Sequence, residues 1–161
     1  MKAFIPASVE GPGTDRVQVA ALCWRMHKGR AEVLLITSRE TGRWVLPKGW
    51  PMTALSLAAT AAREAWEEAG VQGDCDDVPI GQYCYAKLNP QALTLNCTVA
   101  VYPLHVRALK NHFPEAGQRR RVWFAATEAA QLVAEPDLRL LLDLVAADPD
   151  LVQRKNGQGP A

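Results

Sequence analysis

A chain of 161 residues, 48% of them hydrophobic, is long enough for one domain with a substantial core. Its net charge of +1 gives no overall electrostatic reason to expect nucleic-acid or membrane partners. The chain begins without the apolar run of a signal peptide and has no stretch of membrane-spanning length, so we expect a cytoplasmic protein.

The composition along the chain predicts one domain with loose ends. Residues 1–15 are broken by prolines and glycines and are expected to form a flexible lead-in. The polar, glycine-containing residues 153–161 are expected to be a disordered tail. No internal repeat or linker divides residues 16–152, which we interpret as a single domain.

The first part of this domain has the pattern of a hairpin. A strand is predicted from Arg16, a polar turn at 27–30, and a second strand over Glu32–Ser38 that is apolar enough to be buried on both faces. A polar loop then leads to a short apolar strand at 44–46.

The stretch that follows predicts a long helix after a turn at 47–49. The helix is rich in alanine, the best helix former, and Thr53 or Ser56 is expected to cap its start. Gly70 is expected to end it in the left-handed conformation. Small residues on one side allow close packing on a sheet: Ala58, Ala61, Ala62, Ala65 and Ala69.

Three carboxylates share another face of the same helix. Glu64, Glu67 and Glu68 are spaced i, i+3 and i+4, so they project within roughly a 100° arc. They repel one another, and no lysine is interleaved to relieve the repulsion. A solvated acidic helix end is one interpretation; a site for a hard divalent cation, which prefers oxygen ligands, is the other.

Further strands are predicted beyond the helix. A loop at 73–77 leads to strands over 78–88 and 93–106. The polar segment 110–118 is long enough for a functional flap, and a last strand covers 122–125.

Two helices are predicted at the end of the domain. Thr127 is expected to cap the first, and Pro136 to start the second, which continues to Ala147. The whole pattern indicates an α/β or α+β fold, with a mixed sheet and helices on its faces. The four cysteines, which have no zinc or C-x-x-C spacing, are expected to be free and mainly buried: Cys23, Cys75, Cys84 and Cys97.

The segment from Gly49 to Val71 resembles the Nudix box, G-x5-E-x7-R-E-U-x-E-E-x-G-U, in which U is aliphatic. Every fixed position matches except one, where Leu55 stands in place of the first glutamate. The resemblance implies a Nudix α/β/α sandwich in which the box forms a loop-helix-loop. The W-V-L-P-K-G entry and the R-R-R-V-W-F segment look most like the diphosphoinositol polyphosphate phosphohydrolase branch.

The resemblance implies a hydrolase that cleaves a phosphoanhydride with water and Mg²⁺ or Mn²⁺. The substrates implied are diphosphoinositol polyphosphates or dinucleoside polyphosphates. The implied metal ligands are Glu64, Glu67, Glu68 and a main-chain carbonyl at Lys48 or Gly49. Arg63 would hold the carboxylates by paired hydrogen bonds. The catalytic base would be Glu64 or, from the later loop, Glu115.

Polyphosphate substrates also need arginines and lysines, which match phosphate charge and geometry. The candidates are Arg39, Arg43, Lys48, Arg119 and Arg121. Arg120 would face away from Arg119 and Arg121 because side chains alternate along a strand. The alternative interpretation of the arginine run is that it only protects an edge strand from aggregation. We expect a small-molecule partner, neither membrane nor nucleic acid, and a monomer or homodimer.

Other functions remain open. The chain would also suit a nucleotide-sugar or nucleoside triphosphate pyrophosphatase. Because Leu55 replaces the first box glutamate, metal binding would be weaker or altered, and a catalytically impaired nucleotide-binding module is an alternative. RNA binding through Arg119–Arg121 is a third interpretation, which the small net charge disfavours.

Overall fold

The computed structural model describes residues 15–88 and 94–153 of the chain. The expected lead-in and tail therefore fall almost entirely outside the described residues. The strands are β1 (Asp15–His27), β2 (Arg30–Thr37), β3 (Trp44–Val45), β4 (Lys48–Gly49), β5 (Val71–Cys75), β6 (Gly81–Leu88), β7 (Thr94–Leu109) and β8 (Arg121–Ala125). The helices are α1 (Leu57–Ala69), α2 (Ala126–Leu132), α3 (Pro136–Ala147) and α4 (Asp150–Gln153).

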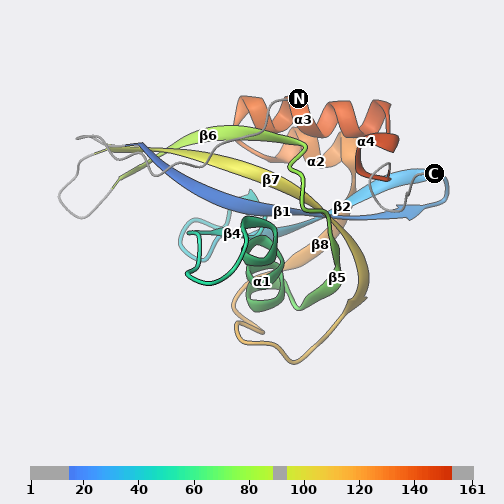
Figure 1. Ribbon diagram of the computed structural model, residues 1–161. Coiled ribbons are helices and arrows are strands. Elements are labelled where there is room, and N and C mark those ends of the chain that lie inside the picture. Colours follow the sequence, from blue (N-terminus) through green and yellow to red (C-terminus); the bar gives the residue numbers. More distant parts are fainter. Residues whose placement is uncertain (1–14, 89–93, 154–161) are drawn as a thin grey trace.

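A mixed sheet forms the centre of the molecule. Its main path runs β3-β2-β1-β7-β5, and β1 and β2 make the expected antiparallel hairpin. The long strand β7 runs parallel to β1 and pairs with β6 along its first half and with β5 along its second. β8 joins the outer side of β2. Figure 1 shows α1 on one face of the sheet and the other helices on the opposite face, which confirms the α/β/α sandwich.

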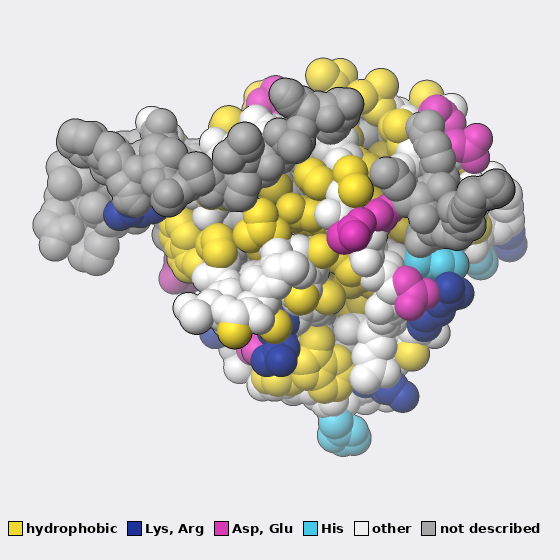
Figure 2. Space-filling model, viewed as in Figure 1, with side chains coloured by type: hydrophobic (Ala, Val, Ile, Leu, Met, Phe, Trp, Pro, Cys, Tyr) yellow, Lys and Arg dark blue, Asp and Glu magenta, His cyan; other side chains and the backbone are white. Residues whose placement is uncertain are grey.

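Strand β1 supplies both cores, because its side chains alternate between the faces of the sheet. Val19 and Ala21 pack in the cluster beneath α1, whereas Ala20 and Leu22 pack in the cluster beneath α2 and α3. The outer side of α3 leaves Leu140 and Leu144 exposed, and hydrophobic side chains are visible there in Figure 2. None of the described helices is long and apolar enough to cross a membrane.

Helix α1 begins and ends as its sequence predicts. The Ser56 hydroxyl accepts a hydrogen bond from the Ala59 N–H at 3.0 Å, so Ser56 and not Thr53 is the cap. Gly70 ends the helix with a φ of 69°. Four of the alanines that face the sheet are buried: Ala58, Ala61, Ala65 and Ala69. Ala62 is only partly buried. This small-residue face lets the helix axis lie close to the sheet.

The structure corrects two local expectations. Residues 71–75 form an edge strand and not a loop, because β7 supplies hydrogen-bond partners that the Gly- and Asp-containing sequence alone does not reveal. Thr127 is not a cap: α2 begins at Ala126, directly from β8, with no side-chain hydrogen bond at its start. The cysteines are free, and Cys84 is exposed while Cys23 and Cys97 are buried.

The cap of α1 generates a stability prediction. Ser56→Ala removes the acceptor for the Ala59 N–H and should lower the free energy of unfolding by about 1 kcal/mol, measured by urea denaturation. Thr53→Ala is the matched control and should have little effect. Equal losses in the two variants would contradict the assignment of Ser56 as the cap.

Candidate active site

The candidate site lies at the C-terminal turns of α1, where three segments meet. Strand β4 pairs with β1 at Val19 and Ala20, which fixes Lys48 and Gly49 beside the helix. The third segment is the loop of residues 110–118, here called the 110–118 loop, which follows β7.

Gly49 makes room for the first carboxylate of the helix. A Cβ atom at position 49 would overlap the carboxyl group of Glu64, closer than non-bonded atoms approach one another. The backbone of β4 and the Glu64 carboxyl therefore lie in direct contact. This contact explains physically why a glycine stands six residues before Leu55 in the box.

Glu64 and Glu68 form a hydrogen-bonded carboxyl pair. Burial, followed by the charge and hydrogen bond of Glu68, raises the pKa of Glu64 to about 8. Burial also raises the pKa of Glu68, although Arg119, the hydrogen bond from Glu64 and the main-chain N–H of Lys48 counteract it. Two neighbouring carboxyl groups that are partly shielded from water repel each other strongly when both are ionised.

The donor set fits a hard divalent cation. Glu67 and Glu115 are also close enough to raise the pKa of Glu64 by their charges, so four carboxyl groups act on one small region. A cation bound by these carboxylate oxygens would relieve the repulsion between them. Without a cation, the proton that Glu64 retains relieves it. Within residues 15–88 and 94–153, no three acidic, histidine or cysteine side chains are already gathered as a metal cage. Glu64 and Glu68 are thus the two members of the candidate site whose carboxyl groups already interact directly.

Arg63 makes only a weak contact with the acidic cluster. Its Nη1 lies 3.8 Å from Glu67 Oε2, and its side chain is 52% exposed. Leu55 lies on the same groove of about 530 Å³ as Arg63 and Trp66, next to α1. A glutamate at position 55 would thus lie on the Arg63 side of the helix, where this chain presents an apolar side chain.

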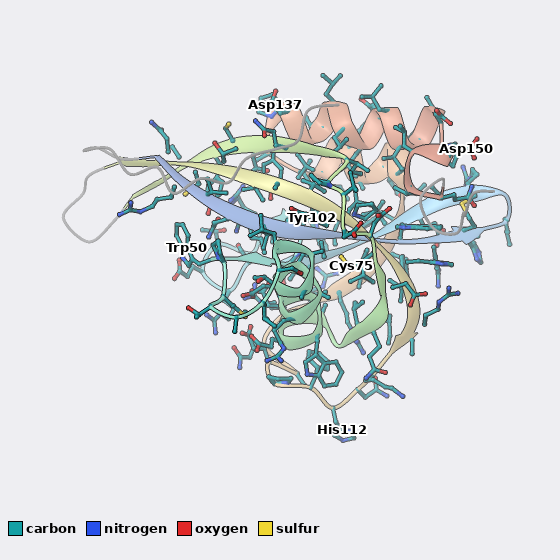
Figure 3. All side chains as sticks on the ribbon, viewed as in Figure 1. Trp50, Cys75, Tyr102, His112, Asp137 and Asp150 are labelled. Atoms are coloured by element: carbon teal, nitrogen blue, oxygen red, sulfur yellow. The ribbon has the colours of Figure 1, made fainter. Side chains whose placement is uncertain are left out.

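The 110–118 loop is docked on the end of α1. Its Lys110 N–H donates to the Gly70 carbonyl at 2.9 Å, and its Glu115 N–H donates to the Glu67 carbonyl at 3.0 Å. The Phe113 ring lies against Gly70, where a Cβ atom would clash with it. Figure 3 shows His112 at the tip of the loop, pointing away from the body of the molecule.

Arg119 and Arg121 contact the acidic end of α1 and the 110–118 loop. Arg119 Nη2 lies 3.1 Å from Glu115 Oε1 and 3.7 Å from Glu68 Oε2. Arg121 Nη1 donates to the Ala69 carbonyl at 2.7 Å, which places a cation at the C-terminus of the helix. Arg120 points the other way, with its guanidinium over the Trp44 ring.

Four of the five predicted substrate-binding residues line one cleft of about 310 Å³, here called the basic cleft. Its lining contains one acidic residue, Glu40, and these four cations: Arg39, Arg43, Lys48 and Arg119. Arg121 is not among its lining residues. The remaining lining residues are Ser38, Thr41, Tyr85 and Ala86.

Tyr85 also lines the basic cleft. The Lys48 Nζ lies 5.0 Å from the centre of its ring, and the Tyr85 hydroxyl donates to Gln18 Oε1 at 2.6 Å. Arg39 and Arg43 are held by Gln118 and Glu135, respectively. These contacts join residues far apart in the chain, so no local motif could have indicated them.

Several known proteins are similar to this chain in sequence or in fold. Nudix hydrolase 16, mitochondrial, from Arabidopsis thaliana is 32% identical over 111 residues, 65% of this chain and 59% of that protein. The chain therefore spans less than two thirds of that relative's length. Diphosphoinositol polyphosphate phosphohydrolase 3-alpha from Homo sapiens is 28% identical over 124 residues, 76% of this chain and 71% of that protein.

A solved structure and a family model extend the comparison. The C. elegans Ap4A hydrolase binary complex has the same fold, with a TM-score of 0.57 at 18% identity, covering 81% of this chain and 95% of that one. The family model of the NUDIX domain matches residues 16–145, a range that includes every residue of the site described above. The chain belongs to the Nudix family.

Proposed function

We propose that this chain is a divalent-cation-dependent hydrolase that cleaves a phosphoanhydride in a diphosphoinositol polyphosphate or a dinucleoside polyphosphate. The observation that carries the proposal is the partly buried Glu64–Glu68 carboxyl pair beside a cleft lined by four cations. Lys48 connects the two parts, since its main-chain N–H binds Glu68 and its side chain lines the basic cleft.

In this proposal Glu64, Glu67 and Glu68 hold Mg²⁺ or Mn²⁺, with a main-chain carbonyl at Lys48 or Gly49. The cation supplies neutralisation of phosphate charge and a lower pKa for water. Glu64 is the preferred base within the box, since its carboxyl lies against the β4 backbone beside the other proposed metal ligands. Glu115 is the alternative base, although Arg119 Nε and Nη2 already bind its Oε1 atom.

The basic cleft supports a substrate with several phosphate groups. Arg39, Arg43 and Lys48 would bind phosphates, since guanidinium and ammonium groups match their charge. Lys48 lies over one face of the Tyr85 ring, which favours an ionic ligand on that side of the ring over a stacked base. The similarity to a diphosphoinositol polyphosphate phosphohydrolase supports the same class of substrate.

A catalytically impaired nucleotide-binding module is the second candidate. Leu55 favours it, because Arg63 lacks a carboxylate partner at that position and makes only its 3.8 Å contact with Glu67. A nucleotide-sugar or nucleoside triphosphate pyrophosphatase remains the alternative within the same chemistry. We further propose a single domain over 16–152, a cytoplasmic location, and a monomer or homodimer that has neither membrane nor nucleic acid as a partner.

A hydrolysis screen tests the proposed reaction. The panel contains a diphosphoinositol pentakisphosphate, diadenosine tetraphosphate, ADP-ribose and NADH, each with Mg²⁺ or with a chelator. Turnover of one of the first two is expected with Mg²⁺ only. Glu68→Gln should lower kcat by at least about 100-fold through loss of a ligand, and Glu128→Gln on exposed α2 should not. Unchanged turnover in Glu68→Gln would overturn the metal role.

The carboxyl pair also predicts how stability depends on pH without metal. Folded Glu64 keeps a proton up to about pH 8, whereas its ordinary pKa is 4.5. The folded state thus binds more protons in this window, and the free energy of unfolding falls as pH rises through it. Glu64→Gln should reduce that fall, because its amide donates to Glu68 at every pH.

Thermal unfolding in a chelator from pH 5 to 9 measures this effect, with Glu128→Gln as the control. The melting temperature of Glu64→Gln should exceed that of the wild type at pH 9, and added Mg²⁺ should stabilise the wild type more. Parallel curves for the wild type and Glu64→Gln would show that burial does not hold the proton on Glu64.

A further inference from the structure

We propose that Arg119 is a positioning residue that holds Glu115 beside Glu68, and that it is not a phosphate ligand. The inference rests on the proposed function and deepens it. It assigns to Arg119 a role different from that of Arg39, Arg43 and Lys48, although all four line the basic cleft.

Each nitrogen of the Arg119 guanidinium has a partner within the protein. Its Nε and Nη2 lie 3.2 and 3.1 Å from Glu115 Oε1, and Nη2 also lies 3.7 Å from Glu68 Oε2. Its Nη1 donates to the Thr37 carbonyl at 3.2 Å. Every nitrogen of the group therefore has a partner. A phosphate that bound Arg119 would compete with these partners for the guanidinium.

Burial makes these contacts more important than those of the other cations in the basic cleft. The side chain of Arg119 is 10% exposed and that of Glu68 12%, whereas Arg43, which pairs with Glu135, is 44% exposed. A charge pair shielded from water is screened less than an exposed one, and removal of one partner leaves the other charge buried and uncompensated. Loss of Arg119 would leave Glu68 and Glu115 to repel each other.

Arg119 lies where it can hold a carboxylate of the 110–118 loop close to a carboxylate of α1. Glu115 belongs to the 110–118 loop and Glu68 to α1, and Arg119 stands where the loop leads into β8. Arg121, two residues on, fixes the other end of the loop through the Ala69 carbonyl and Asn111. The two arginines on one face of this segment therefore join the loop to the helix. A lysine, with a single nitrogen, could not make the three separate contacts of Arg119.

The test compares Arg119→Ala, Arg119→Lys and the matched control Arg120→Ala, whose guanidinium lies over Trp44 outside the site. Hydrogen exchange of the 110–118 loop is measured in the metal-free proteins, and kcat and KM with diadenosine tetraphosphate and a diphosphoinositol pentakisphosphate. Arg119→Ala should speed exchange of the loop at least about tenfold and lower kcat about 10–100-fold, with KM within threefold of the wild type. Arg119→Lys should be intermediate, and Arg120→Ala unchanged.

A double-mutant cycle identifies the partner through which Arg119 acts. In a Glu115→Ala background, Arg119→Ala should add little further change in loop exchange or kcat, because the contact between the two side chains is already lost. A rise in KM with kcat retained would make Arg119 a phosphate ligand and overturn the inference. Unchanged loop exchange in Arg119→Ala would overturn it as well. Absence of turnover in the wild type would instead refute the proposed function, while the exchange measurements would still decide the role of Arg119.

Discussion

The burial of two neighbouring carboxyl groups is the constraint on which the site depends. Glu64 and Glu68 lie on α1 and interact with each other beside β4, and partial burial raises the pKa of both. Such a pair lowers the stability of the fold, because each carboxylate loses hydration and repels the other. The surrounding structure offsets that cost from one side with the Lys48 N–H and from the other with Arg119. A cation between the carboxylates would complete the compensation.

The rest of the fold serves to bring α1 close enough for these contacts. Alanines on its buried face let the helix lie near β1 and β5, and Gly49 lets the β4 backbone touch the Glu64 carboxyl. Larger side chains at either place would lift the carboxylates away from β4. Gly70 plays the same part at the end of the helix, where it admits the Phe113 ring of the 110–118 loop. Small residues thus determine where the charged ones can meet.

Sequence reasoning succeeded where the physics is local. The end of α1 at Gly70 and its buried alanine face follow from backbone conformation and helical period, and capping limited its start to Thr53 or Ser56, of which the structure has Ser56. It failed for β5, whose stability comes from pairing with β7, some thirty residues away in the chain. Sequence reasoning grouped Arg119 with Arg39, Arg43 and Lys48 as substrate-binding candidates, since alternation along a strand indicates which side a residue faces and not which partners lie there. Glu115 and Thr37 become neighbours of Arg119 only through tertiary contacts.

The replacement of the first box glutamate by Leu55 can be interpreted together with the proposed role of Arg119. Arg63, inside the box, has no carboxylate to pair with at position 55 and keeps one long contact with Glu67. The guanidinium that contacts the buried carboxylates comes instead from outside the box, at the junction between the 110–118 loop and β8. Because Arg119 also binds Glu115, order in the acidic cluster is coupled to the position of the loop. The charged partners of the acidic cluster therefore come from two distant segments of the chain. Leu55 removes only the partner that a glutamate at position 55 would have offered to Arg63.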